Sequence, residues 1–78
     1  MLDLLVVDDD APTRRYFEIA ARGLGLVART CATPSQALDV LADTGARLLV
    51  SDLHLGGTDA QGLASALARW PRERRPEF

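Results

Sequence analysis

Three aspartates stand directly after the two most apolar runs of this chain. Leu4–Val7 leads into Asp8 and Asp9, and Leu48–Ser51 leads into Asp52. Clustered carboxylates repel one another, by roughly 4 kcal/mol per pair at about 4 Å and an effective dielectric near 20, so they either hold protons or attract a hard cation. An aspartate can also act as a nucleophile and form an acyl phosphate. The residue types therefore predict a cation site beside a reactive aspartate.

Magnesium suits this set of oxygen ligands. The ion takes about six oxygens in octahedral geometry, usually from one or two carboxylates together with water and phosphate. We expect direct ligands from Asp9 and Asp52, a water-mediated ligand from Asp8, and one oxygen from the backbone carbonyl of His54. The ion would neutralise charge on a phosphoryl group in transfer.

Three short runs of branched apolar residues predict the strands that position these acids. They cover about residues 2–7, 26–31 and 47–51, and buried parallel strands have this composition. Helical patterns follow each run, so the order is βαβαβα, which favours a parallel sheet with right-handed crossovers. In an open α/β sheet the ligand site lies outside the carboxyl ends of the strands, which is where the three aspartates would meet.

Capping residues and apolar spacing predict the helices. Asp10 is expected to cap a helix that begins near Ala11 and Pro12, and Thr33 with Gln36 forms a possible capping box for the next helix. A third helix is expected after Asp59. The first helix has an apolar face at i, i+3, i+4 and i+7 and a charged face that we interpret as ordinary solvent contact. The apolar face consists of Phe17, Ala20, Ala21 and Leu24. The charged face consists of Arg14, Arg15, Glu18 and Arg22.

Composition limits the class of protein. A chain of 78 residues with a net charge of −2 is at most one small domain and indicates no particular partner. The arginines near the C-terminus have no interleaved aromatic residues, so we expect no direct nucleic-acid binding. Cys31 is the only cysteine and is expected to be a small core residue. No apolar stretch is long enough to cross a bilayer and no signal peptide is evident, which predicts a soluble, cytoplasmic chain without membrane contact.

The residues LLVVDDD at 4–10, with Arg14 and Arg15 after them, and LLVSDLHL at 48–55 resemble the receiver domain of two-component response regulators. The resemblance implies a flavodoxin-like, doubly wound parallel sheet with strand order 2-1-3. It also implies that Asp52 is the phosphoacceptor and that Asp9 and Asp8 bind Mg²⁺, directly and through water. His54 would give its backbone carbonyl to the metal. A histidine kinase or a histidine phosphotransfer protein would donate the phosphoryl group, so the module would be a signalling phosphoacceptor rather than an enzyme.

The chain departs from the receiver pattern in two places. Residues 1–78 correspond to about the first three-fifths of a receiver, without its last two strands and helices, and they contain no lysine to bind the phosphoryl oxygens. Gly56 stands where many receivers have proline, and Gly62 lies about two residues late. In this partial domain the third strand becomes an apolar open edge, and such edges invite pairing with other chains. Self-association through that edge is therefore expected.

Two other functions stay open. The missing lysine favours an inactive pseudo-receiver that serves only as an interaction surface. Asp8 and Asp10 also imitate the alternating acids of haloacid-dehalogenase-type phosphatases, with Asp8 as nucleophile, but the threonine falls one place late at Thr13 and no later acidic motif or lysine follows. Asp10 is then better interpreted as a helix cap, and the side chain of His54 as an exposed loop residue.

Overall fold

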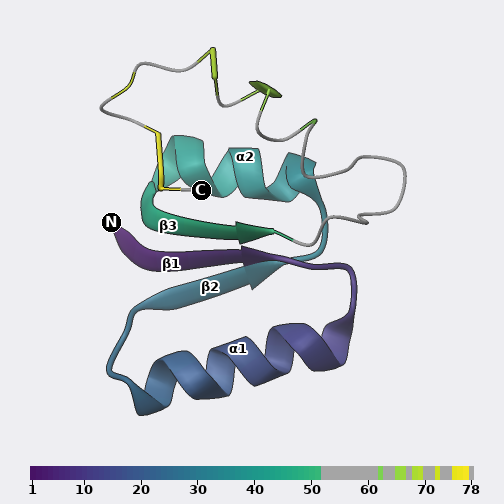
Figure 1. Ribbon diagram of the computed structural model, residues 1–78, viewed down its shortest axis with the longest axis vertical. Helices are drawn as coiled ribbons and strands as arrows, with labels where there is room; N and C mark the ends of the chain where they lie inside the picture. Colours follow the sequence, from purple (N-terminus) through teal and green to yellow (C-terminus); the bar gives the residue numbers. More distant parts are fainter. Residues whose placement is uncertain (52–61, 63–64, 67, 70–71, 73–74, 78) are drawn as a thin grey trace.

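The computed structural model describes residues 1–51, 62, 65, 66, 68, 69, 72 and 75–77 of the chain. Its centre is the strand β1 (Leu2–Val7), which pairs in parallel with β2 (Ala28–Cys31) on one side and with β3 (Ala46–Ser51) on the other. The strand order is β2-β1-β3 (Figure 1). The predicted α/β class, the parallel sheet and the order 2-1-3 are confirmed.

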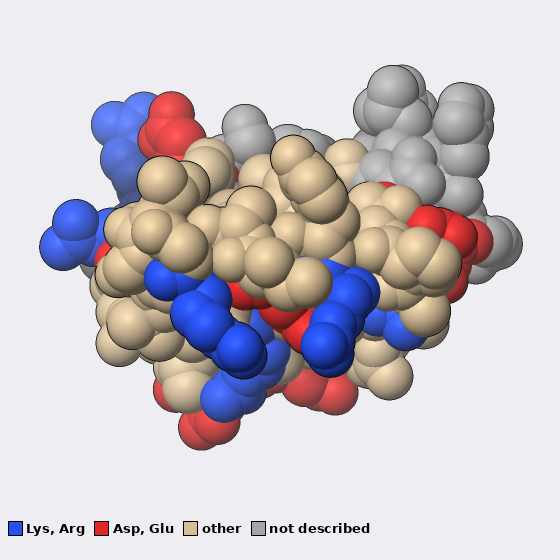
Figure 2. Space-filling view, turned by 90° about the horizontal axis from the view of Figure 1, so that it is seen from below, with Lys and Arg blue, Asp and Glu red and all other residues tan. Residues whose placement is uncertain are grey.

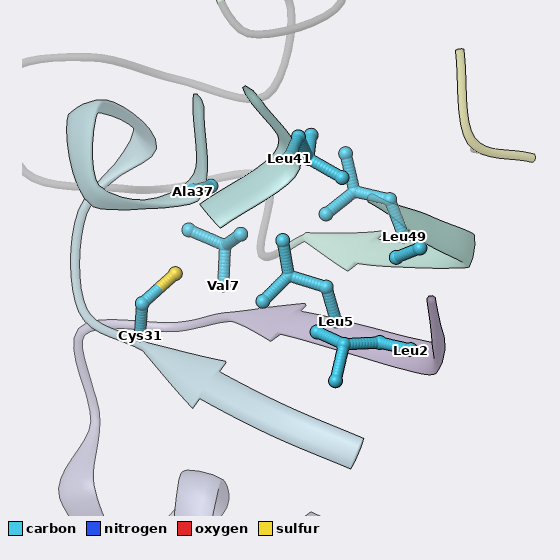
Figure 3. Packing of buried hydrophobic residues seen from close by; sticks show 8 residues of the cluster. Leu2, Leu5, Val7, Cys31, Ala37, Leu41 and Leu49 are labelled. Atoms are coloured by element: carbon cyan, nitrogen blue, oxygen red, sulfur yellow. The ribbon is translucent and has the colours of Figure 1, made fainter. Parts of the chain in front are cut away.

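Both faces of β1 are covered. Leu5, Val6 and Val7 are 0%, 1% and 0% exposed, and consecutive strand residues point to opposite faces of a sheet. The helices α1 (Ala11–Gly23) and α2 (Pro34–Asp43) lie on different sides of the sheet (Figure 1). The side chains of Ala37 and Leu41 from α2 pack over the apolar residues of β1 and β3 (Figure 3).

Helix α1 is fixed at both ends by local hydrogen bonds. Asp10 is its N-cap, as predicted. At the other end the N–H of Leu26 donates to the carbonyl of Ala21 (2.9 Å) and the N–H of Gly25 to that of Arg22 (3.2 Å). This pair of bonds is a Schellman motif, which needs a left-handed residue after the cap. Gly25 supplies it with φ of 72°.

Helix α2 begins at the predicted cap. The N–H of Gln36 donates to Thr33 Oγ1 (3.2 Å), while Gln36 Oε1 accepts from the N–H of Ala32 (2.9 Å). The side chain of Gln36 therefore reaches one residue further back than in a standard capping box, where it would bond to the cap residue itself. The helix ends before Gly45, whose φ of 73° again suits glycine.

Two predictions about the end of α1 are wrong in detail. Leu24 was expected on the buried face, but it is 75% exposed because it occupies the C-cap, where the backbone turns away from the helix. The second strand begins at Ala28 rather than near Leu26, because the N–H of Leu26 already serves the Schellman motif. The N–H of Val27 donates to the carboxylate of Asp3 instead (2.7 Å).

The outer edge of β3 carries a contact that the sequence did not indicate. Glu77 forms a parallel bridge with Leu48. The predicted open edge of β3 is thus paired at this position, and the predicted self-association stays a prediction.

Most of the predicted third helix, after Asp59, lies outside the described residues. Of its described positions, Gly62, Ser65 and Ala66 are helical. Within the part of the chain that the structure describes, no helix has the length and apolar character needed to cross a membrane.

Candidate functional site

The register of the sheet determines where the predicted site residues leave it. Val7, the last residue of β1, pairs with Cys31 of β2 and with Ser51 of β3. The three strands therefore end at one edge, the carboxyl edge where ligands of open α/β sheets bind. Asp8 follows Val7 directly at this edge. Asp52 follows Ser51 in the sequence, but Asp52 and His54 lie outside the described residues.

Three hydrogen bonds hold Asp8. Its N–H donates to the carbonyl of Cys31 (3.0 Å), which ties it to the end of β2. Its carboxylate Oδ1 accepts from the N–H of Asp10 (2.9 Å), and its carbonyl accepts from Nη1 of Arg14 (2.8 Å). The residue is half-buried. The fixed backbone holds the Asp8 carboxylate at the sheet edge with Oδ2 remaining as a second acceptor atom.

Asp9 has a different environment. Its side chain is exposed, and no hydrogen bond engages its carboxylate among those that residues 1–51 make with one another. A carboxylate in this position is accessible to a hydrated cation. Because magnesium keeps several water molecules and takes only one or two carboxylates, an exposed acid beside a partly buried one fits its donor requirements.

Asp10 is committed to the helix. Its Oδ2 accepts hydrogen bonds from the hydroxyl of Thr13 (2.5 Å) and from the N–H of Thr13 (2.9 Å). The Thr13 hydroxyl, followed by the Thr13 N–H, lowers the pKa of the Asp10 carboxyl, since both bonds favour its ionised form. The interpretation of Asp10 as a helix cap is confirmed, and its carboxylate is occupied by that role.

Arg14 is the functional-site residue that sequence reasoning missed. It was assigned to the solvent face of the first helix, yet it is half-buried and its guanidinium donates to the backbone of Asp8. The spacing held an indication of this. Arg14, Phe17 and Ala21 are three and four residues apart, which places Arg14 on the stripe of α1 that faces the sheet.

Cys31 lies at the carboxyl end of β2 and belongs to the core cluster, as predicted. Its thiol Sγ donates to the carbonyl of Thr33 (3.7 Å), and burial raises the pKa of the thiol above its ordinary value. A neutral, buried thiol is a poor nucleophile and a poor metal ligand. Cys31 therefore supports the edge of the sheet by packing.

The predicted magnesium ligands are only partly placed. Asp8 and Asp9 lie at the carboxyl edge, whereas Asp52 and His54 lie outside the described residues. Among the described residues no group of three or more acids, histidines and cysteines is arranged to hold a metal ion. The four-residue set stays a prediction, because two of its members, Asp52 and His54, lie outside the described residues.

The solvent-exposed surface of α1 carries charges of both signs. Arg15, Glu18 and Arg22 are exposed on this helix, and Glu18 accepts a hydrogen bond from the hydroxyl of Thr30 in β2 (2.7 Å). Figure 2 shows basic and acidic side chains interspersed with uncharged ones on this face. Such mixing does not create the extended field of one sign that attracts a polyanion.

Comparison with known proteins adds no assignment. No protein-family model matches the chain, and no curated protein matches it.

Proposed function

We propose that this chain is a receiver-type phosphoacceptor module with a flavodoxin-like, doubly wound design. Asp52 accepts a phosphoryl group from a phosphohistidine, with Mg²⁺ bound by Asp8, Asp9, Asp52 and the carbonyl of His54. The observation that carries the proposal is the pairing of Val7 with Ser51, the residues that immediately precede the paired acids and the proposed acceptor. The covering of both faces of β1 supports the doubly wound design.

The proposed reaction needs a nucleophile, a phosphoryl donor and a cation. An oxygen of the Asp52 carboxylate forms a bond to phosphorus while the phosphorus–nitrogen bond of the donor breaks. The electron pair leaves on nitrogen, which takes up a proton. Bound magnesium would neutralise charge on the phosphoryl oxygens.

The described residues contribute by positioning. The bond from Arg14 to the carbonyl of Asp8 and the bond from Asp8 to Cys31 hold the turn after β1 in one conformation. Asp8 and Asp9 are thereby presented at the carboxyl edge before any cation arrives. Preorganised ligands reduce the ordering cost of binding.

The test is labelling by a small phosphoramidate in the presence of Mg²⁺, read as the mass increase of one phosphoryl group and its loss in hydroxylamine. Asp52→Asn should abolish the label. Asp10→Asn is the matched control, because asparagine also caps helices and Asp10 is committed to Thr13. Labelling that persists in Asp52→Asn would refute the assignment, as would an unlabelled wild-type chain that is folded and binds Mg²⁺.

An interaction module without phosphorylation is the second candidate. The observation that favours it is the complete absence of lysine from these 78 residues, since the resemblance assigns a lysine to the phosphoryl oxygens. A folded chain that neither binds Mg²⁺ nor accepts the label would favour this candidate.

A further inference from the structure

The outer edge of β3 is paired with a short segment around Glu77. The N–H of Glu77 donates to the carbonyl of Arg47 (2.7 Å), and the N–H of Leu49 donates to the carbonyl of Glu77 (2.6 Å). These two bonds form the parallel bridge between Leu48 and Glu77. The segment extends the order β2-β1-β3 by one residue of pairing on the outer side (Figure 1).

The neighbours of Glu77 suit this position. Pro76 is buried, and its ring nitrogen has no hydrogen to donate. Because consecutive strand residues direct their backbone groups to opposite edges, the backbone nitrogen of residue 76 faces away from β3. Proline is found in sheets where the missing donor would face outward, at an edge. Arg75 lines a hollow together with Asp43 and Thr44, at the opposite end of β3 from the candidate site.

Without residues 75–77, the outer edge of β3 would be open to pairing with another strand. Leu48 is 40% exposed and Val50 is half-buried, so the edge combines apolar side chains with backbone groups that point outward. Unprotected edges of this kind pair with strands of other molecules, and natural sheets commonly cover them or place proline beside them.

We infer that residues 75–77 form an edge guard, which occupies the outer edge of β3 and prevents that edge from pairing with the β3 edge of a second copy of this chain. A second copy is the competing partner because its β3 offers the same outward backbone groups and the same leucine. Two such edges can pair around a twofold axis. The inference is independent of the proposed phosphoacceptor function.

Glu77→Pro tests the guard through one atom, since it removes the N–H that donates to Arg47. Glu77→Ala is the matched control, because it loses the same exposed carboxylate but keeps the N–H. Sedimentation velocity over a concentration series should show that Glu77→Pro associates at concentrations about tenfold lower than Glu77→Ala, the effect expected for one to two backbone hydrogen bonds. Equal association of the two variants overturns the inference.

A second substitution locates the contact. Leu48→Lys places a charge on the β3 edge, a substitution that natural edge strands use against pairing. Added to Glu77→Pro, it should return the chain to the association state of Glu77→Ala. Association that persists in the double variant runs through another surface and also overturns the inference.

Amide hydrogen exchange of the unmodified chain provides a readout that needs no variant. The N–H of Leu49 points to Glu77, whereas those of Leu48 and Val50 point to β1. The guard predicts protection at all three amides, and selective loss of protection at Leu49 in Glu77→Pro. Rapid exchange at Leu49 beside protected Leu48 and Val50 in the unmodified chain contradicts a guard that occupies the edge.

Discussion

Val7 and Ser51 are paired residues at the ends of β1 and β3, and their pairing joins two parts of the sequence that each continue into an acid. The geometry at Asp8 and Asp9 depends on the turn into α1 and on the bond from the N–H of Asp8 to the carbonyl of Cys31 in β2. The relation to β3 is not local and depends on the whole sheet.

Magnesium binding should depend on Asp9 and not on Asp10. Asp9 is exposed, and its carboxylate is not engaged within residues 1–51, whereas that of Asp10 is bonded to Thr13. We expect Asp9→Asn to raise the dissociation constant for Mg²⁺ by about tenfold or more, which is about 1.4 kcal/mol, while Asp10→Asn changes it little. Chemical shifts of the backbone amides of residues 8–10 during a Mg²⁺ titration measure both constants. Equal weakening by the two substitutions would contradict this division of roles.

The helix cap at Asp10 should make stability depend on acid pH. Its pKa is lowered in the folded chain by the bonds to Thr13, so the folded state favours the carboxylate. The contribution of the ionised Asp10 carboxylate to stability is fully present above the pKa of Asp10 in the unfolded chain, about 4. It is lost as the pH falls through the lower pKa that Asp10 has in the folded chain. The difference in unfolding free energy between the wild-type chain and Asp10→Asn, which caps without titrating, should therefore be largest near neutral pH and should shrink as the pH falls through the lowered pKa of folded Asp10, as urea unfolding measures. A difference that is constant with pH would exclude this origin.

Truncation of Leu5 should cost more stability than truncation of Leu48. Leu5 is 0% exposed at the centre of the core, whereas Leu48 is 40% exposed at the edge. We expect Leu5→Ala to lower the free energy of unfolding by about 2–5 kcal/mol and Leu48→Ala by less than about 1.5 kcal/mol. Urea denaturation monitored by far-ultraviolet circular dichroism measures both changes. Similar losses would mean that β1 is not the centre of the core.

The thiol of Cys31 should react slowly while the chain is folded. It is buried in the core cluster, and burial raises its pKa, which decreases the fraction of reactive thiolate at neutral pH. Modification by an aromatic disulfide reagent should be much faster in denaturant than in buffer, and Cys31→Ala should show no modification in either. A rapid reaction of the native chain would place the thiol at the surface.

Local chemistry explains what the sequence predicted well. Asp10 and Thr33 cap helices through bonds to residues three positions away, and the runs that form β1 and β3 are apolar enough to be buried strands wherever they pair. The parallel order followed from the alternation of strands and helices.

Three features depended on contacts that a periodic pattern does not contain. Leu24 fits the apolar stripe of α1 but becomes the C-cap, because the Schellman motif at Gly25 uses the backbone there. The spacing of Arg14 places it on the sheet-facing stripe of α1, but spacing alone does not show that its long side chain reaches the carbonyl of Asp8. The bridge between Leu48 and Glu77 joins residues that no local rule relates.

The placement of β1 at the centre of the sheet has a consequence for how the chain acquires its structure. Leu4 pairs with both Ala28 and Leu48, so neither strand pair closes within a hairpin. A chain that emerges from the ribosome can form α1 early, but β1 must wait for β2 and then for β3 before its apolar residues are enclosed. Topologies with such distant pairings fold more slowly than helical bundles of equal size, so β1 exposes its apolar side chains until both neighbouring strands have paired with it.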